Sequence, residues 1–371
     1  MGTPNQNKDK AQREALNLWV KNNWKGTIEL ATGGGKTRIG ILAISHYAKQ
    51  ANYEFKALIV TPTSAIQDEW KKEFKKWGEN RVLIECVEIY CINTARDFEQ
   101  EYYDIGVFDE IHNYVNGEIN SKIFNNNKFD KILGLSASID DAILHHIEKI
   151  APICYTLNVY DALELGLISE FTIYNIGVNL TDWEFKQYQD LTNSINYVRE
   201  KFKKAAWGKI GQRKSLIYKA ANKLKVIQEI ADHFKGKYGI IFSQTKDYAN
   251  LVQKSLGETC IPHHSGLGKK SRVANLNKFA DGRTKIKEIS SAKTLDEGVT
   301  LPRLEWGVIA TGSSKEKQMI QRVGRLLRLD VEGKHAIMFR LYSRNTVEES
   351  WLYSAQKGFK IIDINSVKDI L

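Results

Sequence analysis

Thr27–Gln50 reads TIELATGGGKTRIGILAISHYAKQ, and this stretch decides the fold. It opens on a short apolar strand, Thr27 to Leu30, and closes on a helix, Lys36 to Gln50. Three consecutive glycines lie between them and permit the tight turn that joins the strand to the helix. A strand that passes through such a turn into a helix is half of a βαβ unit, so the stretch predicts an α/β protein with a parallel sheet.

The turn itself, Ala31 to Thr37, has the composition of a phosphate-binding loop. Its glycines leave the backbone free to aim N–H groups at phosphate oxygens, and the helix that starts here adds its positive end. Lys36 is placed to reach the β- and γ-phosphates, and the Thr37 hydroxyl to ligate Mg²⁺. Because Leu30 stands where the strict pattern has glycine, the match is to the shorter T-G-x-G-K-T form. An ordinary glycine-rich turn is the alternative, which the downstream motifs disfavour.

Two adjacent carboxylates, Asp109 and Glu110, follow the apolar run Ile105 to Phe108. Charged side chains are rarely placed at the mouth of a buried strand unless a cation compensates them. With the phosphate loop upstream, we expect Asp109 to hold Mg²⁺ through water, and Glu110 to orient and deprotonate the attacking water. His112 then links this site either to the second domain or to the segment Ser136-Ala137-Ser138.

Strands and helices alternate along the whole chain, which predicts two domains, as does a length of 371 residues at about 150 per domain. The expected strands are Thr27 to Leu30, Ala57 to Thr61, Ile105 to Phe108 and Lys131 to Leu135, then Gly239 to Phe242, Lys285 to Ser290, Trp306 to Ala310 and Ala336 to Leu341. The expected helices are Ala11 to Asn22, Lys36 to Gln50, Ser64 to Trp77 and Asp141 to Ile150, then Lys246 to Leu256, Lys270 to Phe279, Lys315 to Arg322 and Thr346 to Gln356, with a longer helical region from Asp182 to Phe234. A break near Cys154 to Val159 makes residues 1–157 and 158–371 two α/β domains, each a doubly wound parallel sheet flanked by helices.

The charge balance favours a polyanionic partner. The formal net charge is +10 and the sequence pI is near 9.1, an excess typical of nucleic-acid-binding proteins, with a merely soluble basic protein as the alternative. No run of about 18 apolar residues is present in the sequence, so we expect no membrane span. The polar start, Met1 to Lys10, shows no secretory signal, and the four scattered cysteines fit reduced thiols, so an intracellular protein is expected.

A basic segment in the second half, Gln321 to Arg328, reads QRVGRLLR. Alone it fits a solvated helix face. Because it lies in the second α/β series, an arginine here can neutralise charge on the γ-phosphate when two domains close. Arg325 and Arg328 are the candidate arginine fingers, and Gln321 and Arg322 are expected either to support the cleft or to relay its closure. Such an arrangement couples hydrolysis to domain motion, as in a motor.

The order of these motifs resembles that of the superfamily 2 helicases and translocases, across nearly the whole chain. Leu30 to Thr37 is similar to motif I, and Asp109 to His112 is similar to motif II. Gln12 resembles the adenine-reading glutamine that precedes motif I. The remaining motifs match as follows: motif Ia is Thr61-Pro62-Thr63, motif III is Ser136-Ala137-Ser138, motif IV is Ile241-Phe242-Ser243, motif V is Leu295–Val299 and motif VI is Gln321–Arg328.

The resemblance implies two tandem RecA-like domains, an ATP site in the cleft between them, and ATP and Mg²⁺ as cofactors. It implies nucleotide contacts from Gln12, Thr32, Gly33, Gly34, Gly35, Lys36, Thr37, Arg38, Asp109, His112, Gly298 and Arg322. It implies catalytic roles for Lys36, Glu110, Gln321, Arg325 and Arg328, with Thr37 and Asp109 as the protein's ligands to Mg²⁺.

Two segments resemble the XPB-like and UvsW-like DNA helicases more specifically. Asp161 to Ile168, DALELGLI, is similar to their entry segment. The resemblance continues in Leu295 to Val299, then in Thr311 to Ser314 and Gln321 to Arg328. Those relatives act on DNA in repair, recombination and fork remodelling. Three features depart from the pattern: motif III is Ser-Ala-Ser rather than Thr-Ala-Thr, Thr300 stands where many relatives carry aspartate, and Gln12 lacks the usual upstream arginine–aromatic pairing.

In such relatives a single strand crosses the tops of both domains and is held mainly through its phosphates, which carry affinity without sequence information. The implied contacts are Thr61, Pro62, Thr63, Asn93, Thr94, Ser243, Gly266 and Thr294. The basic segments Arg199 to Lys204 and Lys209 to Lys214 could widen this track, with a solvated helix face as the alternative. Base stacking or ordinary packing is open to four aromatic residues: Trp183, Tyr188, Tyr197 and Trp207.

These inferences predict an ATP-driven helicase or translocase that moves on or remodels DNA, by unwinding, branch migration or fork remodelling in repair, recombination or replication. Single-stranded or branched DNA is the expected partner, and a monomer suffices because one chain supplies both walls of the ATP cleft. An RNA helicase is the main alternative, since no residue identifies a reader of the 2′-hydroxyl. A nucleotide-gated binding module with little unwinding, or the motor subunit of a restriction system, also remains open.

Overall fold

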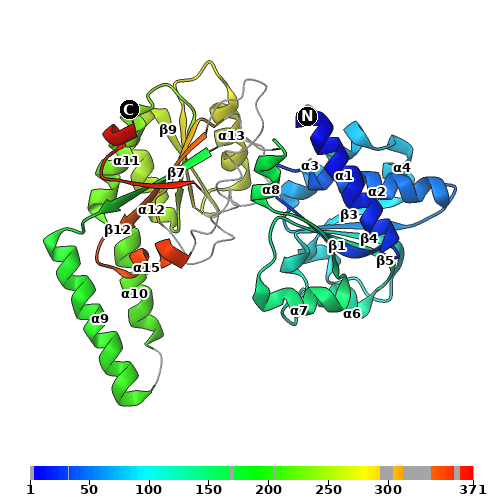
Figure 1. The fold of residues 1–371 in the computed structure, drawn as a ribbon, viewed down its shortest axis with the longest axis horizontal. Helices are drawn as coiled ribbons and strands as arrows, with labels where there is room; N and C mark the ends of the chain where they lie inside the picture. The colour runs from blue at the N-terminus through cyan, green and yellow to red at the C-terminus, as the bar shows by residue number, and fades with distance from the viewer. Residues whose placement is uncertain are drawn as a thin grey trace. The chain divides into compact units, whose positions relative to one another are not determined.

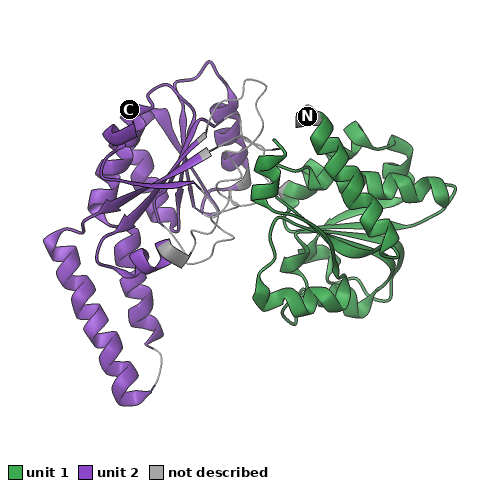
Figure 2. Cartoon of the chain, in the orientation of Figure 1, with its two compact units in different colours: residues 1–169, 297–299 green, residues 170–296, 300–371 purple. Residues whose placement is uncertain are grey.

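The computed structural model describes residues 4–31, 33–167, 171–203, 206–292, 304–311, 336–354 and 360–370. The chain divides into two compact units, residues 1–169 with 297–299 and residues 170–296 with 300–371 (Figure 2). The first unit therefore extends past the break expected at 157/158 and includes α8 (Val159–Glu164). Asn7 Nδ2 donates to the Leu165 carbonyl at 2.9 Å, which ties the end of α8 to this unit. The boundary between two functional domains at residues 157 and 158 stays a prediction.

The first unit is built on a six-stranded sheet in the order β3-β2-β4-β5-β1-β6, with every described pairing parallel. Its strands are β1 (Lys25–Leu30), β2 (Ala57–Thr61), β3 (Val87–Cys91), β4 (Tyr102–Asp109), β5 (Lys128–Ser136) and β6 (Ile153–Leu157). Its other elements are α1 (Pro4–Lys21), α2 (Lys36–Gln50), α3 (Ser64–Trp77), α4 (Asn80–Glu85), α5 (Ile92–Ala95), η1 (Ile111–Asn113), α6 (Lys122–Asn126), α7 (Asp141–Ile150) and α8. All five residues of β2 are buried, as expected for a strand covered by helices on both faces.

The second unit is built on a seven-stranded sheet in the order β13-β7-β12-β11-β8-β10-β9, again parallel in every described pairing. Its strands are β7 (Phe171–Val178), β8 (Gly239–Ser243), β9 (Cys260–His264), β10 (Glu288–Ala292), β11 (Trp306–Ile309), β12 (Ala336–Ser343) and β13 (Ile361–Ile364). Its other elements are α9 (Asp182–Phe202), α10 (Trp207–Tyr218), α11 (Ala221–His233), α12 (Lys246–Leu256), η2 (Gly257–Thr259), α13 (Lys269–Ala280), α15 (Val347–Ser354) and η3 (Val367–Ile370). Helices α9 and α10 pack along each other and project away from this sheet (Figure 1).

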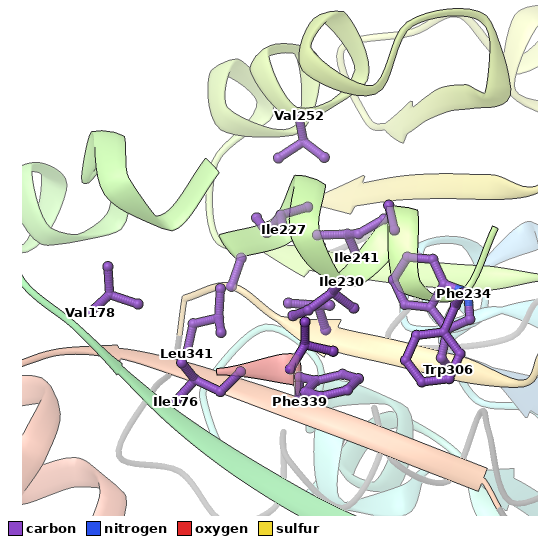
Figure 3. Packing of buried hydrophobic residues seen from close by; sticks show 14 of the residues in the cluster. Ile176, Val178, Ile227, Ile230, Phe234, Ile241, Val252, Trp306, Phe339 and Leu341 are labelled. Atoms are coloured by element: carbon purple, nitrogen blue, oxygen red, sulfur yellow. The ribbon is translucent and has the colours of Figure 1, made fainter. Parts of the chain in front are cut away.

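The core of the second unit lies between its central strands and α11. Trp306 on β11 stacks on Phe234, which follows α11, with ring centroids 5.8 Å apart, and Phe234 meets Phe339 of β12 edge-on at the same separation (Figure 3). Ile227 and Ile230 of α11 belong to the same buried cluster. This packing positions β8, whose last residues, Ile241 to Ser243, are motif IV.

Most interior elements confirm the sequence-based expectations, whereas four of the five strands missed within the described residues lie at sheet edges. Four helices have the predicted bounds residue for residue: α2, α3, α7 and α12. Strands β3, β6, β9 and β13 each lie at an edge of their sheet, and none was predicted. An edge strand is covered less completely than a central one, so its apolar pattern is weaker. Strand β7 was also missed, and the predicted helix Lys315 to Arg322 lies outside the described residues.

Helix α1 begins at Pro4 rather than at the predicted Ala11, which adds seven residues to its amino-terminal end. This difference matters because the added turns carry side chains that reach the phosphate-binding loop. None of the helices in the described part of the chain is long and apolar enough to cross a membrane.

Candidate nucleotide-hydrolysis site

The site lies in the first unit, at the carboxyl ends of three neighbouring strands. β4, β5 and β1 are adjacent in the sheet and parallel, so their carboxyl ends meet at one edge. The glycine-rich loop follows β1, Asp109 ends β4 and Ser136 ends β5. Ligands of open parallel α/β sheets bind outside this edge. The fold therefore brings motifs I, II and III together although they lie far apart in the sequence.

The loop after β1 is shaped to present backbone amides. Gly33 and Gly35 have φ angles of 91° and 90°, a left-handed conformation that favours glycine. Gln12 Nε2 donates to the Gly34 carbonyl at 2.7 Å, and Lys8 Nζ donates to the Gly33 carbonyl at 2.6 Å. Because a trans peptide holds N–H opposite C=O, the Gly35 N–H points away from α1. Together with the amino terminus of α2, this amide suits a phosphate group.

Lys36, at the start of α2, is paired with the proposed base. Its Nζ lies 2.9 Å from Glu110 Oε1, and the two side chains are 14% and 12% exposed. Glu110 Oε2 accepts the backbone N–H of Ala137 at 3.3 Å. Glu110 also has a φ angle of 55°, which is uncommon for a residue other than glycine and is often found at functional sites. The Lys36 ammonium and the Glu110 carboxylate are therefore in direct contact.

Asp109 is 7% exposed, and its carboxylate accepts a hydrogen bond from Trp70 Nε1 at 2.7 Å. Burial and the neighbouring Glu110 raise the pKa of Asp109 to about 7, against the lowering influence of Lys36. A buried carboxylate of this kind is compensated by a cation, so the residues present fit Mg²⁺. Within the described ranges no group of three or more His, Cys, Asp or Glu could hold a metal by itself. Magnesium would therefore be shared by Asp109, Thr37 and the nucleotide phosphates.

His112 contacts motif III, one of the two links considered from the sequence. Its Nδ1 lies 2.8 Å from Ser136 Oγ and 3.4 Å from Glu110 Oε2, and the Ser136 hydroxyl donates to the Ser138 carbonyl at 2.8 Å. The contact joins the carboxyl ends of β4 and β5 beside the proposed base. A direct nucleotide contact from His112, which is 8% exposed, stays a prediction.

Gln12 is buried and both ends of its amide are engaged. While Nε2 binds the loop, Oε1 accepts from Arg38 Nη1 at 2.6 Å. Arg38 also pairs with Asp9 at 2.7 Å and lies over the Trp77 ring, 4.6 Å from its centroid. Arg38 of α2 thus connects the buried Gln12 of α1 to Trp77 of α3. Adenine recognition by Gln12 and Arg38 stays a prediction.

Sequence reasoning missed Lys8, Asp9 and Trp70. Lys8 and Asp9 lay outside the helix predicted from Ala11, yet Lys8 and Gln12 are four residues apart and share a helix face. Recognising Pro4 as a helix start would have brought them into view. Trp70 lay in a correctly predicted helix, but a buried tryptophan indicates a core position by itself. Its indole partner is visible only in three dimensions.

The implied nucleic-acid contacts follow the carboxyl ends of strands in both units. Thr63, Asn93, Thr94 and Gly266 are exposed, and Pro62 is half-buried. Thr61 and Ser243 differ, because both are buried and both hydroxyls donate to backbone carbonyls. Their hydroxyls are engaged within the protein, and nucleic-acid contacts at Thr61 and Ser243 stay a prediction. Trp183, Tyr197 and Trp207 are exposed on α9 and α10, whereas Tyr188 is buried.

Several candidate residues lie outside the described part of the chain: Thr32, Thr294, Gly298, Gln321, Arg322, Arg325 and Arg328. Their roles stay predictions from the motifs.

A phosphate loop, a lysine, a buried aspartate and an adjacent glutamate at one sheet edge define a P-loop nucleoside triphosphatase, and the second parallel unit is typical of a two-part motor. Residues 4–96 match the family described as type III restriction enzyme, res subunit, and residues 222–330 match the helicase conserved C-terminal domain.

Curated relatives and solved structures agree with these matches. The DNA 3′-5′ translocase XPB2 of Sulfurisphaera tokodaii is 24% identical over 375 residues, covering 91% of this chain and 82% of the relative. The ATP-dependent rRNA helicase RRP3 of Meyerozyma guilliermondii is 22% identical over 362 residues, covering 94% and 71%. The structure of S. cerevisiae Dbp5 bound to RNA and ADP BeF3 aligns with a TM-score of 0.67 and 17% identity, covering 95% of this chain and 89% of that one.

Together these findings identify a superfamily 2 helicase core, and the resemblance stated from the motifs is confirmed. The two parallel sheets are its RecA-like units. The chain is an ATP-hydrolysing helicase.

Proposed function

We propose that this chain is an ATP-driven DNA translocase or helicase that moves on or remodels single-stranded or branched DNA. One observation carries the proposal: Lys36, Asp109 and Glu110 converge at the carboxyl edge of the first sheet, with Lys36 and Glu110 in direct contact. Bound ATP with Mg²⁺ supplies the phosphoryl group and the metal's charge. Lys36 then binds the phosphates, Asp109 holds the metal, and Glu110 takes the proton of the attacking water.

Nucleic acid as the partner is supported by charge and by exposure. The chain carries a formal net charge of +10. The exposed residues Thr63, Asn93 and Thr94 follow β2 and β3, in the same unit as the site. Contacts of this kind act on phosphates and give affinity without sequence preference.

We propose DNA rather than RNA as the substrate because the XPB2 relative is named as a DNA translocase. Its alignment covers most of this chain and most of the relative. The second candidate is an RNA helicase, favoured by the similarity to RRP3 and to the Dbp5 structure with RNA. The match of residues 4–96 to a restriction-enzyme subunit supports a third use of the same motor, in a restriction complex. A role in repair, recombination or replication is supported by the resemblance of the motifs to those of the XPB-like and UvsW-like helicases.

The decisive experiment compares ATP hydrolysis by the full chain with single-stranded DNA, forked DNA, four-way DNA and single-stranded RNA of matched length. We expect DNA to stimulate turnover more than RNA does, with strand displacement or triplex displacement on the preferred DNA. Equal or greater stimulation by RNA would overturn the DNA assignment. Stimulation without displacement by any substrate would favour the nucleotide-gated binding module. Glu110→Gln serves as the control for contaminating ATPases.

A further inference from the structure

A buried tryptophan, Trp70, connects helix α3 to Asp109, the carboxylate expected to bind the metal. Helix α3 follows Thr61-Pro62-Thr63, a segment predicted to contact nucleic acid. Helix α3 starts after its N-cap Thr63, whose side chain accepts from the Ile66 N–H at 3.4 Å. Trp70 lies about two turns further on and is fully buried. Its Nε1–H donates to Asp109 Oδ2 at 2.7 Å. A side chain 39 positions earlier in the sequence thus holds the last residue of β4.

The chemistry of the contact suits orientation rather than charge compensation. An indole N–H is a donor only, carries no charge and keeps one direction once its ring is packed. It therefore restrains the rotation of the Asp109 carboxylate without competing with a cation for its negative charge. Carboxylates that bind metals are commonly held by hydrogen bonds of this sort, and their loss typically weakens metal affinity or activity by about 10- to 100-fold.

The orientation of the Trp70 ring is itself determined by α2. A Cβ atom added at Gly40 would lie 2.5 Å from Trp70 Cη2 and 3.2 Å from Val107 Cγ1, so the glycine permits the close approach of the ring. Lys36 and Thr37 lie one turn earlier on the same helix. Trp70 is consequently in contact with the helix that carries the phosphate-binding residues and with the strand that carries Asp109.

We propose that Trp70 is a positioning residue that orients Asp109 toward the Mg²⁺ of the bound nucleotide. The inference rests on the proposed function only in taking Asp109 as the metal-binding carboxylate. Loss of the Trp70 indole would alter the response to Mg²⁺ more than the binding of the nucleotide itself. In the contacts described, Trp70 touches neither the phosphate-binding loop nor Gln12 and Arg38, the residues predicted to face the base.

Trp70→Phe removes the N–H and keeps an aromatic ring. The chain also offers a matched control, because Trp19 is fully buried in the same unit and its Nε1 donates to the Ile132 carbonyl at 2.8 Å. Trp19→Phe therefore removes an equivalent buried hydrogen bond away from Asp109. Circular dichroism and thermal melting of the full-length variants establish that both are folded before binding is compared.

The measurement is the fluorescence anisotropy of ADP that carries a ribose fluorophore, titrated with Mg²⁺ in the absence of nucleic acid. We expect Trp70→Phe to raise the half-saturating Mg²⁺ concentration about 10-fold or more, with binding in EDTA unchanged. Trp19→Phe should match the unsubstituted chain in both. Equal Mg²⁺ dependence for the two variants would overturn the proposal. Because no turnover or nucleic acid is involved, a wild-type chain that lacks nucleic-acid stimulation would contradict the proposed function and leave this test intact.

A second measurement needs no substitution and applies if Trp70→Phe does not fold. The unsubstituted chain, labelled with ¹⁵N-tryptophan, gives one indole N–H signal for each of its eight tryptophans. With Mn²⁺ in place of Mg²⁺ and ADP bound, paramagnetic relaxation should broaden one indole signal beyond the others. Uniform broadening, or none, would count against a tryptophan N–H that contacts a metal-binding carboxylate.

Discussion

Lys36 Nζ lies 2.9 Å from Glu110 Oε1, so the phosphate-binding lysine and the proposed base form an ion pair with each other. Both side chains are largely removed from solvent, which strengthens their attraction relative to a surface pair. A nucleotide phosphate must compete with the carboxylate for the same ammonium group. Binding would then release Glu110 for the water that it is expected to activate.

Glu110→Gln should reduce nucleic-acid-stimulated hydrolysis by about 100-fold or more, because an amide takes no proton from water. Nucleotide affinity should be unchanged or tighter, since Lys36 loses its competing carboxylate. Lys36→Ala should abolish hydrolysis and weaken binding as well. Steady-state kinetics together with fluorescent ADP binding separate the two effects. Normal turnover in Glu110→Gln would remove Glu110 from the role of base.

Arg328→Ala should lower kcat by about 1,000-fold while changing nucleotide affinity much less, because an arginine finger acts on charge that develops during the reaction. Arg283→Ala is a suitable control in the second unit, since Arg283 is highly exposed and pairs only with Asp281 among the described ion pairs. Measurement of kcat and of ADP binding for both variants gives the comparison. An unchanged kcat in Arg328→Ala would leave Arg325 as the candidate.

Gly35→Ala should abolish nucleotide binding. The residue has a φ angle of 90°, and an added Cβ would overlap Gln12 Nε2, so the loop must shift. Gly117→Ala is the matched control because its φ angle is 94° and the space beside it is open. Both variants should lose about 1–2 kcal/mol of stability from the left-handed backbone. Thermal melting and ADP binding test the pair, and retained binding in Gly35→Ala would contradict the geometry of the loop.

Lys223→Met should destabilise the second unit by about 3–5 kcal/mol, because it leaves the carboxylate of Glu348 buried without its cation. The two side chains are 0% and 2% exposed, and their atoms lie 2.6 Å apart. The double variant Lys223→Met with Glu348→Gln should recover part of the lost free energy of unfolding. Lys219→Met, which breaks an exposed pair with Asp247, should change stability by less than about 1 kcal/mol. Urea denaturation followed by circular dichroism measures all three variants.

His263 should make stability fall as the pH is lowered. Burial, with Arg272 and His264 nearby, lowers the pKa of His263 from 6.5 to about 4. Between these values the unfolded chain binds a proton that the folded chain does not, so the free energy of unfolding decreases from about pH 6.5 to about pH 4. Urea midpoints over this range should therefore fall less steeply in His263→Gln than in the unsubstituted chain. Identical slopes would contradict the depressed pKa.

The sequence predicted the central elements of the fold well because each carries a complete local pattern. Helices α2, α3, α7 and α12 have an apolar stripe between recognisable start and stop residues. The fully buried strands β2 and β8 form short apolar runs. Edge strands such as β3 are only partly covered, so their mixed composition resembles that of a loop. The early start of α1 escaped detection because its first turns are polar.

The sequence by itself determined the chemical groups of the site: a glycine-rich loop, the Lys36 ammonium and the paired carboxylates Asp109 and Glu110. These follow from short motifs whose meaning is local. Only the tertiary structure decided which groups satisfy one another. Lys36 reaches Glu110 across 74 positions because parallel strands β1, β5 and β4 bring their carboxyl ends together. Trp70 reaches Asp109 across 39 positions because β2, which precedes α3, pairs in parallel with β4. Strand order is a property of the whole sheet, and no short stretch of sequence encodes it.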